Sequence, residues 1–124
     1  MSHFAKLENV DPEELHAQYA LTEALWSRLV GLGIQSGTSG RIEAFFFADH
    51  EHTAASLVGA FTSSGWLQEI SKTEEGVGRR RVKVVTPEVN LTREAFLELV
   101  EVMMIAAHEH SCVFDGFQVA TPVR

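Results

Sequence analysis

The chain has 124 residues, enough for one compact domain, and 45 % of them are hydrophobic, an ordinary share for a globular protein. Its formal net charge of −7 argues against a protein whose main task is to hold nucleic acid phosphates. No apolar run approaches the roughly 18 residues needed to cross a bilayer, and the first residues lack a secretory signal pattern. One cysteine cannot build a disulfide framework. We therefore expect a cytoplasmic protein that binds neither a membrane nor nucleic acid directly.

Residues 11–33 are predicted to form the first helix. Asp11 is a suitable N-cap, Pro12 fits the first helical position, and Glu14 stands where a capping-box acid reaches back. Gly31 and Gly33 favour termination. The apolar side chains that recur at helical spacing are Leu15, Tyr19, Trp26 and Leu29 or Val30.

The glycine-, serine- and threonine-rich segment 34–40 is predicted to be a flexible link. We therefore divide the chain into an N-terminal helix with its linker at 1–40 and a main domain at 41–124. The pattern in the main domain predicts strands at 41–48, 66–73, 79–86 and 114–121, helices at 51–64 and 92–110, and a hairpin loop at 74–78.

The predicted order after residue 40 is β-α-β-β-α-β, which is the split βαβ or ferredoxin-like arrangement of the α+β class. Right-handed crossovers place both helices on one face of an antiparallel sheet with strand order 4-1-3-2. The run Phe45-Phe46-Phe47 in a central strand sends aromatic rings to both faces. A cover is therefore expected for Phe45 and Phe47: either the N-terminal helix, through Tyr19 and Trp26, or a second subunit of a homodimer.

The last predicted strand is preceded by a histidine-containing helix end and begins with Phe114-Asp115-Gly116-Phe117. This segment, together with Gly65-Trp66 before the second strand, resembles the family called regulator of ribonuclease activity B (RraB). The resemblance covers about residues 41–124. At the positions of Phe114 and Phe117 the family usually has tyrosine and tryptophan.

The resemblance implies a ferredoxin-like fold and no enzymatic activity, and we assign no cofactor. It also implies inhibition of ribonuclease E through contact with its non-catalytic scaffold region, and the divergence at the aromatic positions leaves a different partner open. Independently of any family, Gly116 predicts a bulge or tight strand entry. The residues proposed to bind a protein partner are Glu109, Phe114, Asp115, Gly116 and Phe117.

Two His-Glu-His segments, at 50–52 and 108–110, are expected to meet at one end of the sheet. Imidazoles and carboxylates suit Zn²⁺, but the spacing matches no known metal motif, so solvated histidines are the simpler interpretation and no metal ligand is assigned. Cys112 is interpreted as structural, because nothing marks a third catalytic group or an oxyanion site. The basic run at 79–81 with Lys83 is interpreted as a solvated strand edge.

The leading hypothesis from the sequence is therefore a non-enzymatic regulator that binds a ribonuclease or its assembly. A dimeric ferredoxin-like module that senses a ligand or metal is the alternative. An enzyme with a histidine in a pocket over the sheet is a third.

Overall fold

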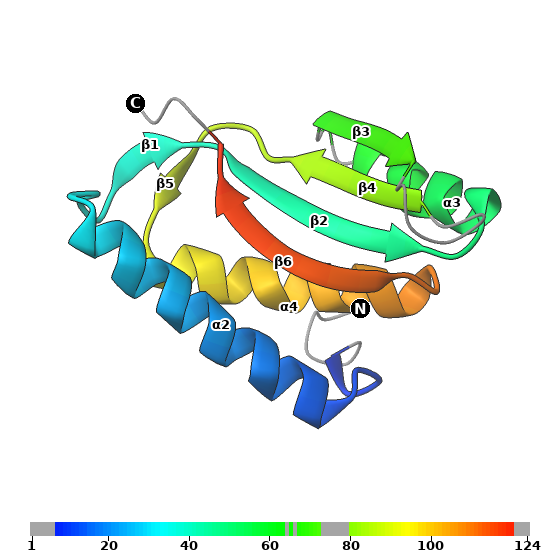
Figure 1. Cartoon of the computed structure of the whole chain (residues 1–124), viewed down its shortest axis with the longest axis horizontal. Coiled ribbons are helices and arrows are strands. Elements are labelled where there is room, and N and C mark those ends of the chain that lie inside the picture. Colours follow the sequence, from blue (N-terminus) through cyan, green and yellow to red (C-terminus); the bar gives the residue numbers. More distant parts are fainter. Residues whose placement is uncertain (1–6, 64, 66, 73–79, 121–124) are drawn as a thin grey trace.

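The computed structural model describes residues 7–63, 65, 67–72 and 80–120 (Figure 1). The predicted loop at 74–78 lies outside these residues, as do Trp66 and Arg79. The helices of the described part are α2 (Pro12–Gly31), α3 (Glu51–Ser63) and α4 (Arg93–Glu109). Its strands are β1 (Thr38–Gly40), β2 (Ile42–Ala48), β3 (Leu67–Lys72), β4 (Arg80–Val85), β5 (Val89–Leu91) and β6 (Val113–Val119).

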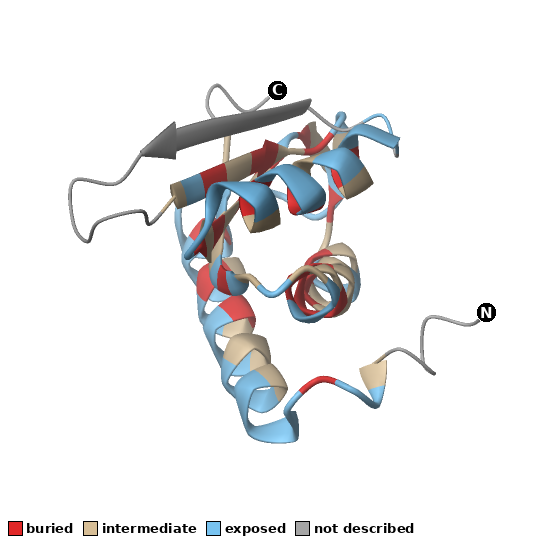
Figure 2. Ribbon diagram, turned by 90° about the vertical axis from the view of Figure 1, so that its right-hand side faces the viewer, coloured by how far each residue is buried: buried red, intermediate tan, exposed pale blue. Residues whose placement is uncertain are grey.

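The strands form two antiparallel sheets, so the α+β class is confirmed. The larger sheet has the strand order β3-β4-β2-β6, and β1 pairs with β5 in the smaller one. Figure 2 shows the helices below the strands, with α3 and α4 packed against the sheet. None of the helices in the described ranges has the length and apolar character needed to span a bilayer.

The prediction of a flexible link at 34–40 is wrong for its last three residues. Thr38, Ser39 and Gly40 pair with residues 89–91, and the Gly37 N–H donates to the carbonyl of Leu91 at 2.8 Å. Gly40 allows this close approach, because a Cβ atom there would lie 2.9 Å from Cδ1 of Leu91. The pairing partner is about fifty residues away in sequence, so the local composition could not reveal it.

The cap predicted for α2 is confirmed, since the Asp11 side chain accepts a hydrogen bond from the Glu13 N–H at 3.0 Å. Pro12 is the first residue of this helix, and Gly33, with φ of 98°, follows its end. Thr92 caps α4 in the same manner through the Ala95 N–H.

Two groups of buried side chains fill the space between the sheet and the helices. Phe46 is at the centre of the first, and its ring centroid lies 5.8 Å from that of Phe61 and 5.3 Å from that of Phe114. The second group joins the C-terminal half of α2 to the small sheet and the start of α4. It consists of Leu25, Leu29, Ile42, Leu91 and Phe96.

Helix α2 does not cover the phenylalanines on the outer face of β2, contrary to one of the two expectations. Its Tyr19 donates a hydrogen bond to Glu101 of α4, and its Trp26 packs against Phe96. Phe45 and Phe47 remain half-buried, and the guanidinium carbon of Arg81 lies 4.3 Å from the centroid of the Phe45 ring. Helix α2 therefore packs on the other side of the sheet, beside α4 and the edge strand β6.

Candidate partner-binding groove

The predicted irregularity at Asp115-Gly116 is confirmed as a β-bulge in β6. The register against β2 pairs Phe46 with Phe114 and Phe45 with Gly116, so Asp115 is the extra residue. Gly116 has φ of +126°, a conformation that side-chain-bearing residues rarely adopt. In a regular strand, residues 114 and 117 would point to opposite faces because their separation is odd. The bulge places both phenylalanines on the helix side.

Helix α2 lies beside this part of β6, and the seam between them contains two adjoining pockets that share Gln18. We call this seam the α2–β6 groove. Its first pocket, of about 350 Å³, is lined by Val10, Asp11, Glu14, Ala17, Gln18, Met104, Ala107, His108, Cys112, Val113 and Phe114. Its second pocket, of about 260 Å³, is lined by Gln18, Leu21, Thr22, Ala24, Leu25, Arg28, Asp115, Gly116 and Phe117.

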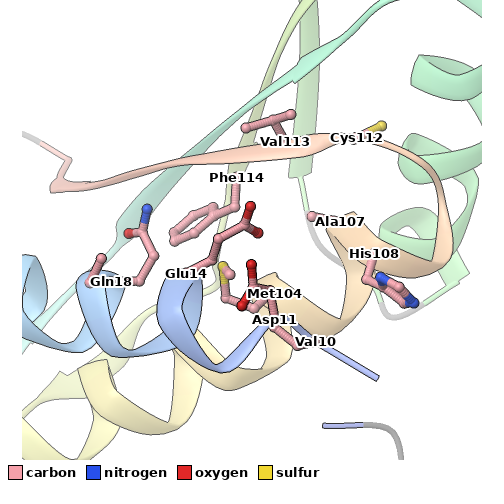
Figure 3. A pocket seen from close by; sticks show the side chains of 11 residues that line it. Val10, Asp11, Glu14, Gln18, Met104, Ala107, His108, Cys112, Val113 and Phe114 are labelled. Atoms are coloured by element: carbon pink, nitrogen blue, oxygen red, sulfur yellow. The ribbon is translucent and has the colours of Figure 1, made fainter. Parts of the chain in front are cut away.

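The first pocket has an apolar floor and an acidic rim. Met104 and Phe114, which are only 6 % and 5 % exposed, belong to the floor. Figure 3 shows the carboxylates of Asp11 and Glu14 on the α2 side, close to Met104 and Phe114, and the ring of His108 at the opposite side. Among the described residues that line it there is no lysine or arginine.

The second pocket differs in charge, because it carries Arg28 and Asp115 at its boundary. Leu21, 60 % exposed, forms part of its α2 wall, and Val113, 61 % exposed, lines the first pocket from the β6 side. Because both side chains border the same groove, a molecule bound along it would cover Leu21 and Val113 together.

The groove contains four of the five residues proposed from the sequence. Phe114 lines the first pocket, and Asp115, Gly116 and Phe117 line the second. Phe114 is buried, so its ring contributes to the floor of the first pocket and not to its exposed rim. Glu109 is exposed at the end of α4 and lines neither pocket.

The contribution of α2 was missed by reasoning from the sequence. Asp11, Glu14, Gln18 and Leu21 all line the groove, although the resemblance to a known family begins only at residue 41. One signal was available: Leu21 is a large apolar residue that lies off the predicted buried stripe of the helix.

The second His-Glu-His segment contacts α3, the helix that begins within the first segment. His110 Nδ1 lies 2.6 Å from the Ser56 Oγ of α3, and the rings of His50 and His52 are stacked with centroids 5.3 Å apart. Within the described ranges, however, no group of three or more histidine, cysteine, aspartate or glutamate residues is placed to hold a metal ion.

The thiol of Cys112 is half-buried and contacts two backbone carbonyls. Its Sγ lies 3.3 Å from the carbonyl oxygen of His110 and 3.7 Å from that of Thr53. Burial raises the pKa of the Cys112 thiol, and the Asp49 carboxylate raises it further against the opposing hydrogen bond with Thr53. Because the thiolate is the reactive form, this environment disfavours nucleophilic chemistry.

Tyr19, which contacts Glu101 of α4, also keeps its proton at neutral pH. Burial is the main cause, and the hydrogen bond and negative charge of Glu101 add to it, so that the pKa of Tyr19 rises to about 12. The hydroxyl thus joins α2 to α4 as a hydrogen-bond donor.

No family model matches the chain, and no curated protein is significantly similar to it.

Proposed function

We propose that this protein is a non-enzymatic regulator that binds another protein through the α2–β6 groove. The observation that carries the proposal is the combination of an apolar floor with Leu21 and Val113 exposed on opposite walls. A protein segment that buries these two side chains would remove apolar surface from water, and this is favourable by about 25 cal/mol per Å².

The identity of the fold belongs to the same proposal. With β2, β3, β4 and β6 counted as the first to fourth strands, the order β3-β4-β2-β6 fits a ferredoxin-like sheet. The resemblance of the Phe114–Phe117 segment to RraB supports a ribonuclease of the ribonuclease E type, or its assembly, as the partner. Inhibition or modulation of that ribonuclease is the expected consequence of binding.

The test is capture of partners from native lysate by the tagged protein, with mass spectrometry as readout. Leu21→Lys should reduce the captured partner several-fold, because it introduces a charge into the apolar wall of the groove. Leu32→Lys is the matched control, since Leu32 is 76 % exposed at the end of the same helix and lines neither pocket of the groove.

Equal capture by both variants and the unmodified protein would exclude the groove as the binding surface. Captured ribonuclease should then be mixed with the purified protein and its cleavage of an RNA substrate measured. Unchanged cleavage at saturating protein would exclude the regulatory role.

A further inference from the structure

The first pocket of the groove combines negative charge with an apolar interior. Asp11, Glu14 and Gln18 follow each other on one face of α2 at spacings of three and four residues, so their side chains stand in a row along the rim. Met104, Ala107 and Phe114 are buried and form the apolar surface beneath them.

The two carboxylates are positioned by the start of the helix. Asp11 is fixed as the N-cap by the Glu13 N–H, so its side chain is held at the mouth of the pocket. Glu14, one turn later, directs its carboxylate toward Phe114 and Met104 in Figure 3. His108 lies on the other side of the pocket, with its ring turned away from Glu14 in the same view.

A long basic side chain has the matching chemistry. Lysine and arginine bury an apolar stem while their charged end stays at a polar rim, and a carboxylate pair binds a guanidinium or ammonium group through charge-assisted hydrogen bonds. The pocket volume of about 350 Å³ is sufficient for one such side chain. The carboxylates of Asp11 and Glu14, the lack of lysine and arginine among the described lining residues, and the net charge of −7 disfavour an anionic occupant.

We infer that this pocket receives a lysine or arginine side chain of the protein partner, with the stem on Met104 and Phe114 and the cationic end between Asp11 and Glu14. The inference rests on the proposed function and adds the chemistry of the partner segment. It also predicts how the partner segment lies along the groove. The basic residue of the partner enters the first pocket, because the second pocket, which contains both Arg28 and Asp115, lacks this excess of negative charge.

The test uses N-butylguanidinium chloride as a mimic of the arginine side chain and pentanoate as an anionic probe of similar size. Methyl signals of Met104 and Ala107 are followed by NMR during titration of the full chain. Saturable shifts with N-butylguanidinium, at about 1–10 mM for so small a ligand, would support the inference. Shifts of equal size with pentanoate, or none with either probe, would overturn it.

The double variant Asp11→Asn with Glu14→Gln removes both charges and keeps the cap, because asparagine is as good an N-cap as aspartate. It should weaken N-butylguanidinium binding about fivefold. Glu8→Gln with Glu13→Gln is the matched control, since it removes the same charge from nearby exposed residues that do not line the pocket. If the control weakens binding equally, N-butylguanidinium responds to the negative charge of this region as a whole and not to the two pocket carboxylates, and the inference is false.

The outcome is separable from that of the proposed function. Loss of partner capture in Leu21→Lys together with no binding of N-butylguanidinium would reject the basic-residue pocket and support the regulator. Binding of N-butylguanidinium with no effect of Leu21→Lys on capture would support the cationic site and reject the groove as the docking surface.

Discussion

Phe114 and Phe117 are three residues apart in β6, yet their rings meet edge to face with centroids 4.9 Å apart. The contact exists because the bulge at Asp115 and Gly116 returns the second ring to the helix side of the sheet. Phe117 then also approaches Phe96 of α4, at 6.1 Å between centroids, and so connects the two groups of core residues. The bulge therefore shapes both the core and the floor of the groove.

Replacement of Gly116 by alanine should lower the free energy of unfolding by about 1–3 kcal/mol. A Cβ atom at Gly116 would meet no atom within 4 Å, so the cost arises from φ of +126° alone. Urea denaturation measures the change. Gly59→Ala in α3 is the control: its Cβ would also meet no atom within 4 Å, and helix propensity should make it stabilising by about 0.5–1 kcal/mol. Equal effects of the two substitutions would contradict the assigned backbone strain.

The alkaline titration of Tyr19 should reveal its contact with Glu101. Tyr19 is the single tyrosine of the chain, so tyrosinate absorbance near 295 nm reports it alone. The midpoint should lie near pH 12 in the folded protein and near 10 in urea. Because the pKa is higher in the folded state, the stabilisation is complete below about pH 10 and is lost as the pH rises toward 12. Glu101→Gln should lower the folded-state midpoint, and an unchanged midpoint would refute the coupling.

Cys112 should react slowly with iodoacetamide, because its thiol is partly buried and its pKa is raised. Asp49→Asn removes a negative charge that raises this pKa, so alkylation at pH 8 should become faster. Glu51→Gln removes the same charge two residues further along and should leave the rate nearly unchanged. Cys112 is the single cysteine, so mass spectrometry of the intact protein gives the rate directly. Identical rates in both variants would exclude the influence of Asp49.

The elements that could be predicted are those whose signals are local. The cap at Asp11, the bulge at Gly116 and the four long strands and three helices follow from side-chain chemistry within a few residues of each position, and their ends are right within about two residues. What could not be predicted depends on distant partners. Strands β1 and β5 exist because Thr38 and Leu91 meet, and the groove exists because α2 packs against β6. Neither contact leaves a periodic pattern in the sequence.

Within the binding surface predicted from the sequence, the contribution of Glu109 at the end of α4 can be separated from that of the groove with two single substitutions. Asp115 lines the second pocket, whereas Glu109, also exposed, lines neither pocket. Asp115→Asn should therefore reduce partner capture about fivefold, because it removes a boundary charge from the docking surface. Glu109→Gln removes an equal charge and should leave capture unchanged. Circular dichroism and the melting temperature verify that both variants remain folded. An equal loss of capture in Glu109→Gln would place the partner across the histidine-rich end of the sheet, because only a surface that includes the end of α4 brings Glu109 into contact.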